Sequence, residues 1–181
     1  MARDTSTDQI TNDLIQRYVN ILSPLAGWGV LRDGTKSVYP NLGLPMPQEP
    51  FPAAYVYVSG IAFDWGLLHQ GIRRDIYTIG IRILGGMATP YTVVSSGLFK
   101  GDFPEIAVYK MITSVVNELT YRPFLNDPIS NNAFRYLDPN SRASVNPITR
   151  VTNYSYSEQG SFIGMEVPAS VTLIIKQGRA G

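Results

Sequence analysis

Residues 72–84 show the most regular alternation of apolar and polar side chains in the sequence. Apolar residues occupy every second position from residue 77, and Thr78, Gly80 and Arg82 lie between them. Successive side chains of a β-strand point to opposite faces, so this pattern predicts a strand with one buried face and one mainly polar face. The positions expected to be buried are Tyr77, Ile79, Ile81 and Ile83.

Two segments have the periodicity of amphipathic helices. In residues 8–22 and 103–120, apolar side chains recur at spacings of three and four. Asp102 and Glu105 form a capping-box-like pair at the start of the second segment. We expect each helix to pack on the core through one apolar stripe.

The remaining regular elements are predicted to be strands. Residues 53–59 form one, and residues 149–157 and 161–176 form a final hairpin. Residues 60–71 are expected to be a connection, because glycines punctuate them. The order of helix, strands, helix and strands predicts an α+β fold with a single domain over residues 1–181. We expect a mostly antiparallel sheet of about four to six strands, with two main helices packed on one face.

Two long loop regions interrupt these elements, a proline-rich arm (residues 39–52) and a loop region (residues 121–148). Proline cannot donate to a β-ladder and disfavours helix in the residue before it, so the arm should be extended. The arm also holds large apolar side chains, so it either folds back on its own core or docks on a neighbouring subunit. These side chains are Leu42, Leu44, Met46 and Phe51, and Phe134 is a further apolar side chain in the second loop region.

Charge and composition argue against several classes of protein. The net charge is +1 without a run of like charges, whereas a dedicated nucleic-acid-binding protein usually shows a basic stripe. No apolar stretch approaches the ~18 residues of a membrane span. The polar N-terminus lacks the apolar segment of a secretory signal. We therefore expect no contact with a membrane.

Signatures of catalysis and of metal binding are nearly absent. The sequence has no cysteine, and its single histidine, His69, excludes a metal site built on two histidines. It contains neither a nucleophile elbow nor a P-loop. A pair of carboxylates could still meet in space, and Asp64, Asp75 and Asp102 are the candidates. We expect no catalytic residue, no cofactor and no metal ion.

Two arginines, Arg73 and Arg74, stand at the start of the alternating strand, beside Asp75. They could contact phosphate groups. Two arginines at such a position are more typical of a solvated sheet edge that discourages pairing with another sheet.

The order and character of these segments resemble the tail terminator (tail-completion) proteins of long-tailed bacteriophages. Those chains begin with an amphipathic helix, here residues 8–22, and continue with a strand of the form Phe-Pro-Ala-x-x-Val-Tyr. A long alternating strand, a helix and a hairpin with an aromatic-rich first strand follow. The matching segments are Phe51-Pro52-Ala53-Ala54-Tyr55-Val56-Tyr57 and residues 75–83, 151–157 and 169–175.

The resemblance implies a structural virion protein, assembled in the host cytoplasm, that forms a hexameric ring in the neck. Such a ring caps the tail tube and joins it to the head-side connector. Its partners would be the major tail tube protein and a connector or stopper protein. The sheets would line the channel, with Arg82 facing the channel or a neighbouring subunit, and the helices would face outward. DNA would pass without specific binding, which suits the net charge of +1.

Three alternatives stay open. The chain could be another neck or tail component (a head-closure, tube or minor tail protein), a small α+β enzyme with an unrecognised carboxylate site, or a cellular α+β adaptor domain. For the tail terminator, the candidate interface residues are Leu42, Leu44, Met46, Phe51, Arg73, Arg74, Arg82 and Phe134.

Overall fold

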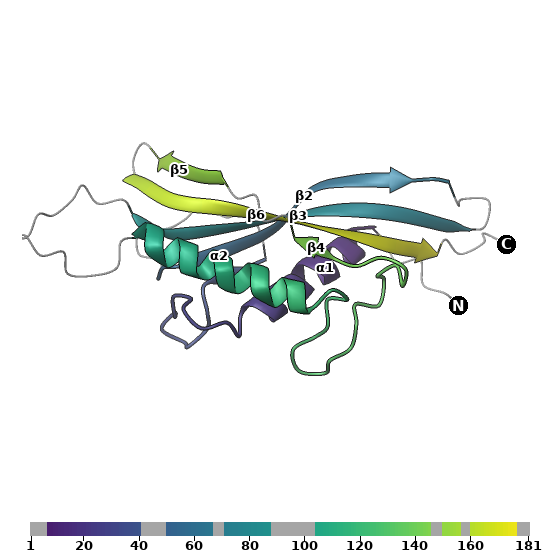
Figure 1. Cartoon of the computed structure of the whole chain (residues 1–181), viewed down its shortest axis with the longest axis horizontal. Helices are drawn as coiled ribbons and strands as arrows, with labels where there is room; N and C mark the ends of the chain where they lie inside the picture. The colour runs from purple at the N-terminus through teal and green to yellow at the C-terminus, as the bar shows by residue number, and fades with distance from the viewer. Residues whose placement is uncertain are drawn as a thin grey trace, which may run out of the picture.

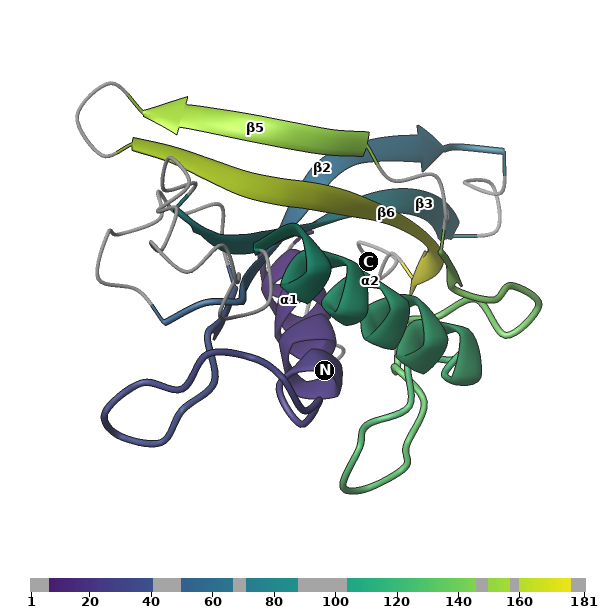
Figure 2. The same ribbon diagram turned by 60° about the vertical axis from the view of Figure 1, so that its left-hand side comes forward.

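Two helices cover one face of a twisted six-stranded sheet in the computed structural model (Figure 1). The structure describes residues 7–40, 50–66, 71–87, 104–145, 150–156 and 160–176. The elements are α1 (Thr7–Leu22), β1 (Val38–Tyr39), β2 (Ala53–Asp64), β3 (Ile72–Met87), α2 (Pro104–Tyr121), β4 (Ser144–Val145), β5 (Arg150–Tyr156) and β6 (Gly160–Lys176). Both helices lie on the same side of the sheet in a second view (Figure 2). The predicted single-domain α+β fold is confirmed.

Strand β3 lies at the centre of the sheet. It pairs antiparallel with β2 on one side and with β6 on the other, along nearly its full length. β1 adds a short parallel pair at the outer edge of β2. The outer edge of β6 is divided between β5, β4 and an isolated bridge to Leu137. The strand order is therefore β1-β2-β3-β6-β4, with β5 beside β6.

The predicted alternation of β3 is confirmed. Tyr77, Ile79, Ile81 and Ile83 are all 0% exposed, whereas Thr78 between them is exposed. Burying an apolar side chain of this size contributes about 1.5–3 kcal/mol, so this row is a main source of stability. The same core cluster contains Val56 of β2, Val167, Val171 and Leu173 of β6, Leu14 and Tyr18 of α1, and Val115 and Leu119 of α2.

The helices and the final hairpin also match the prediction, to within a residue or two at each end. Beyond α1, Trp28 Nε1 donates a hydrogen bond of 2.8 Å to the carbonyl of Leu22, which satisfies one of the last helical acceptors. α2 begins at Pro104, and the first turn is where a missing N–H costs least.

Strand β2 is longer than predicted, because it continues through residues 60–64, which the sequence suggested were a connection. A β-bulge lies between Val58 and Gly60, with Ser59 as the extra residue, and it hides the continuation of the strand in the sequence pattern. The bulge shifts the alternation by one position, so Val58 and Ile61 both pack against the core. Gly60 therefore marks the bulge and not the end of the strand.

Much of the second loop region also belongs to the core. Leu125 is 0% exposed and Phe134 is 4% exposed. Tyr136 and Leu137 pack against the same cluster. Phe134 was a candidate interface residue of this loop, but the structure buries it in the chain's own core. Its ring centre lies 5.6 Å from that of Tyr136 and 5.8 Å from the guanidinium carbon of Arg17 in α1.

Replacing Ile81 with alanine should lower the free energy of unfolding by about 2–5 kcal/mol, because it empties a fully buried position. Thr78→Ala is the matched control, since Thr78 is exposed on the other face of the same strand. It should change the free energy by no more than about 1 kcal/mol, the span of β-strand propensities. Urea unfolding followed by circular dichroism measures both values. Equal losses in the two variants would contradict one-sided burial of β3.

Candidate functional site

The face of the sheet opposite the helices, here called the open face, is covered by no helix in the described part of the chain (Figures 1 and 2). β2, β3 and β6 contribute alternate residues to it, in rows set by the strand register. The rows are Tyr55, Arg82 and Glu166; Tyr57, Gly80 and Pro168; Gly60, Thr78 and Ser170; and Ala62, Ile76 and Thr172. The open face thus mixes aromatic, small and charged residues.

Arg82 lies on the open face, and its charge is paired. Its Nη2 atom is 3.6 Å from Oε2 of Glu166, and its guanidinium carbon is 5.6 Å from the centre of the Tyr57 ring. A carboxylate and an aromatic ring together restrict the guanidinium to one position. The predicted placement of Arg82 opposite Ile81 is confirmed. Its contact with a channel or a neighbouring subunit stays a prediction.

Gly80 lets Tyr57 lie against the backbone of β3. A Cβ atom at Gly80 would stand 2.5 Å from Cζ of Tyr57, which is too close for any real contact. A side chain at this position would therefore displace the Tyr57 ring from Arg82. The glycine within the alternating strand has a packing role on the open face.

The two ends of the proline-rich arm fold back on their own sheet. Phe51 and Tyr39 pack against a small cluster on the open face that includes Tyr55 and Leu84. The ring centres of Tyr39 and Tyr55 are 5.3 Å apart. The other three candidate residues of the arm, Leu42, Leu44 and Met46, lie outside the described residues.

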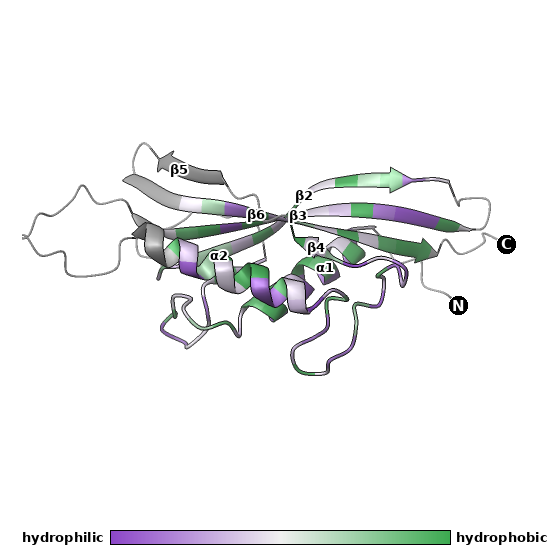
Figure 3. Cartoon of the chain, in the orientation of Figure 1, coloured by the Kyte–Doolittle hydropathy of each residue, from purple (hydrophilic) through white to green (hydrophobic). Residues whose placement is uncertain are grey.

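Arg73 and Arg74 are not at a sheet edge, because β3 is central, so that prediction is wrong. Nε and Nη2 of Arg73 each donate a hydrogen bond of 2.7 Å to the carboxylate of Asp75, which is 0% exposed. Nε of Arg74 lies 3.0 Å from Oδ2 of Asp138, whose side chain is 1% exposed. Each arginine thus neutralises a buried carboxylate. Figure 3 shows a hydrophilic stretch near the start of β3.

An aromatic platform, consisting of Phe63, Trp65 and Arg73, lies at the end of β2. The Arg73 guanidinium carbon is 5.1 Å from the ring centre of Phe63 and 5.4 Å from that of Trp65. The two rings are 47% and 52% exposed. Sequence reasoning missed this platform, although one signal was present: Arg73 and Asp75 are two residues apart in a strand and so share a face.

Asp64 and Asp75 do not form the carboxylate pair that the sequence left open. Asp75 pairs with Phe63 in the β2–β3 register, so the next residue, Asp64, points to the opposite face. Asp102 and His69 lie outside the described residues. Among the residues that the structure describes, no group of three or more His, Cys, Asp or Glu could hold a metal ion.

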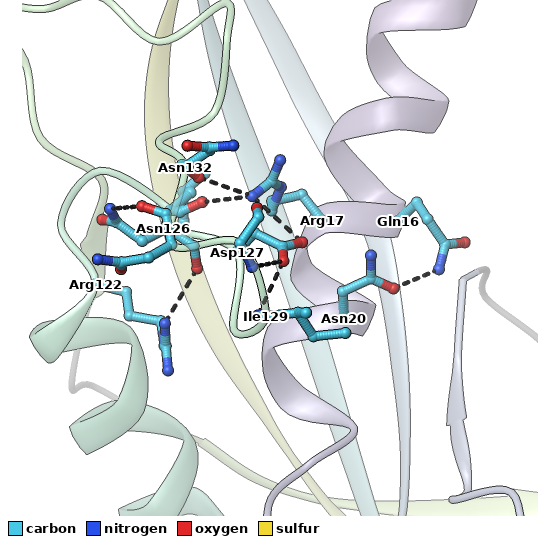
Figure 4. Close-up of polar contacts among 11 residues, drawn as sticks. Gln16, Arg17, Asn20, Arg122, Asn126, Asp127, Ile129 and Asn132 are labelled. Carbon is cyan, nitrogen blue, oxygen red and sulfur yellow. Dashed lines mark hydrogen bonds and ion pairs between the residues drawn. The ribbon is translucent and has the colours of Figure 1, made fainter.

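Arg17 of α1 ties down the loop that follows α2 (Figure 4). Its Nη1 donates a hydrogen bond of 3.0 Å to the carbonyl of Asn132 and lies 3.5 Å from Oδ2 of Asp127. Oδ1 of Asp127 accepts hydrogen bonds from the backbone N–H groups of Ile129 and Ser130, at 3.0 and 2.9 Å. This turn holds Ile129 at its tip, 97% exposed. The backbone hydrogen bonds, first that of Ser130, lower the pKa of the Asp127 carboxyl.

Comparisons with protein-family models and with curated proteins give no relative from which a role could be transferred. No protein-family model matches this sequence, and no curated protein matches it. Within the described residues, no helix has the length and apolar character needed to cross a membrane. The function therefore has to be inferred from the residues and their geometry.

Replacing Asp75 with alanine should lower the free energy of unfolding by about 3–5 kcal/mol, because the Arg73 guanidinium then stays buried without its charge partner. Asp13→Ala is the matched control. Asp13 pairs with Arg135, but their side chains are 36% and 62% exposed. Its loss should cost less than about 1 kcal/mol. Urea unfolding measures the free energy of unfolding of both variants. Equal losses would contradict a structural role for the buried Arg73–Asp75 pair.

Protonation of Asp127 should loosen its turn at acid pH. The pKa of Asp127 is lowered from 3.8 in the folded chain, so its hydrogen bonds stabilise the turn above that value. The stabilisation is lost as the pH falls through the lowered pKa. Protection of the Ile129 and Ser130 amides from hydrogen exchange should fall in that range, while core amides stay protected. Asp127→Ala should lose this protection already at neutral pH, and unchanged protection would refute the assignment.

Proposed function

We propose that this chain is a tail terminator of a long-tailed bacteriophage, a structural virion protein that forms a hexameric ring in the neck. The observation that supports this most is the one-sided sheet. α1 and α2 cover one face. On the open face of β2, β3 and β6, Tyr39 and Phe51 cover the end at Tyr55 and Leu84, and the rest is left for a channel or a neighbour. In a ring whose sheets face inward, this layering puts the helices outside, as the resemblance implies.

The charges of the open face favour a channel that DNA passes over a site that binds DNA. Arg82 is paired with Glu166, and Arg74 is paired with Asp138. Affinity for DNA comes largely from lysine and arginine contacts with phosphate groups, and it rises with their number. Arginines that are already neutralised by carboxylates offer few such contacts. DNA could therefore slide along this face without being held.

The loops on the helix side suit contacts with the two neighbours of such a ring, the major tail tube protein and the head-side connector or stopper protein. Tyr121 and Ile129 are 83% and 97% exposed at and after the end of α2. Arg17 and Asp127 hold the turn that presents Ile129. A side chain presented by a fixed turn loses little conformational entropy when it docks.

A mixture of the purified chain with tail tubes of its own phage should yield rings of six copies at one end of each tube. Native mass spectrometry counts the copies, and negative-stain electron microscopy locates the rings. A chain that stays monomeric in the presence of finished tubes would contradict the proposal. Incorporation along the whole tube would instead support a tube protein, the nearest alternative.

A pair of lysine variants tests which face lines the channel. Thr78 is exposed on the open face, and Thr113 is exposed on α2. Rings of Thr78→Lys carry added positive charge in the proposed channel and should retain DNA at low salt, because phosphate contacts strengthen as salt falls. Rings of Thr113→Lys should behave like the parent protein. The reverse result would place the helices, and not the sheet, along the channel.

A further inference from the structure

The outer edge of β2 offers backbone groups for pairing with another strand. β1 meets only Ala54 and Tyr55 at this edge. On its other side, β2 pairs with β3 as far as Asp64. Within the described part of the chain, residues 58–64, here called the β2 edge, therefore meet no strand on their outer side. At about 3.3 Å per residue, this edge is roughly 20 Å long.

The β2 edge lacks most of the features that keep sheet edges apart. Natural edges are usually protected by lysine, by proline or by a bulge. Residues 58–64 contain no lysine, arginine or proline, and their one charge is Asp64 at the far end. The bulge at Ser59 lies at the start of the edge, and regular pairing with β3 resumes at Gly60. An apolar edge of this kind is an aggregation hazard unless a partner covers it.

The aromatic platform lies at the end of this edge. Tryptophan, arginine and other aromatic residues are enriched where binding energy is concentrated in protein interfaces. Arg73 contacts both exposed rings, and its two hydrogen bonds to buried Asp75 hold it in place. The β2 edge therefore ends in a preorganised anchor, which reduces the entropy lost on binding.

The strand that fits this edge is β5 of a second copy. β5 pairs with β6 along one side, and within the described residues no strand pairs along its other side. It lies beyond β6, on the far side of β3 from β2. Its 7 residues equal the length of residues 58–64. Contact between two different edges is heterologous and closes into a ring when the rotation allows. A symmetric β2–β2 contact would leave the β5 edge open.

We infer that the β2 edge of one subunit pairs with β5 of the next, with Phe63 and Trp65 as anchors, so that the sheet continues from subunit to subunit. The closure of this chain of contacts into a ring rests on the proposed function. The inference adds which two strands form the contact between neighbouring subunits. The partner is thus a second copy of this chain, bound through backbone hydrogen bonds at an open sheet edge.

Disulfide cross-linking tests this pairing directly, because the chain has no cysteine of its own. Ala62, exposed on the β2 edge, is replaced by cysteine in one batch of full-length protein. Thr152, Asn153 and Tyr154 of β5 are replaced by cysteine singly in others, to cover neighbouring registers. A disulfide needs Cα atoms within about 7 Å, so it forms only between adjacent strands. Thr113→Cys on α2 is the control partner.

Mixtures of Ala62→Cys with at least one β5 variant should form cross-linked dimers under mild oxidation, and the mixture with Thr113→Cys should not. Dimers of Ala62→Cys alone would show β2–β2 pairing and overturn the inference. Six-membered rings without any β2–β5 cross-link would also overturn it, while leaving the proposed function intact. Open polymers that contain the β2–β5 cross-linked pairs but never close into rings would support the pairing and contradict the hexamer.

Ala62→Lys provides a second measurement that does not depend on cross-linking geometry. A charge on an exposed edge is a device by which natural proteins prevent sheet pairing. This variant should lose the oligomer in native mass spectrometry while its urea midpoint stays that of the parent monomer. An intact oligomer would overturn the inference.

Discussion

The alternation of β3, which buries Tyr77, Ile79, Ile81 and Ile83 under the helices, is the constraint on which the rest of the structure depends. Because β3 is central, β2 and β6 align their apolar residues with Tyr77, Ile79 and Ile81. The row that results is where α1 and α2 pack. The opposite residues of the same strands then have no helix above them in the described part of the chain. In antiparallel sheets of this type, one face commonly packs on the core and the other carries no helix layer.

Buried or partly buried arginines join the sheet to the segments around it. Arg74 links β3 to Asp138 in the loop before β4, and Arg17 links α1 to Asp127 in the loop after α2. Arg73 neutralises Asp75 and also orders two aromatic rings at the end of β2. An ion pair in such a position contributes little net stability to the fold. Removing one partner is nevertheless costly, because the other charge then stays buried without compensation. These contacts therefore define positions of loops and edges more than they stabilise the core.

The spacing of apolar residues predicted β3 and both helices, because each of these elements packs one face against the same core. The second half of β2 escaped prediction because the bulge at Ser59 shifts the alternation and Gly60 resembles a turn. The burial of Phe134 depends on contacts far along the chain, which loop composition does not encode. Arg73 was assigned to an edge because no local pattern tells a central strand from an outer one. The open face followed from the alternation, but its pairing of Arg82 with Glu166 needed the β3–β6 register.

A cryo-electron microscopy map of the assembled neck of the phage tests the central claim most directly. We expect six copies of this chain at the end of the tail tube, with Thr78 and Arg82 facing the DNA channel and α1 and α2 on the outer wall. A ring in which α2 lines the channel would contradict the assignment of the open face. A neck that contains no copy of the chain would contradict the proposed function itself.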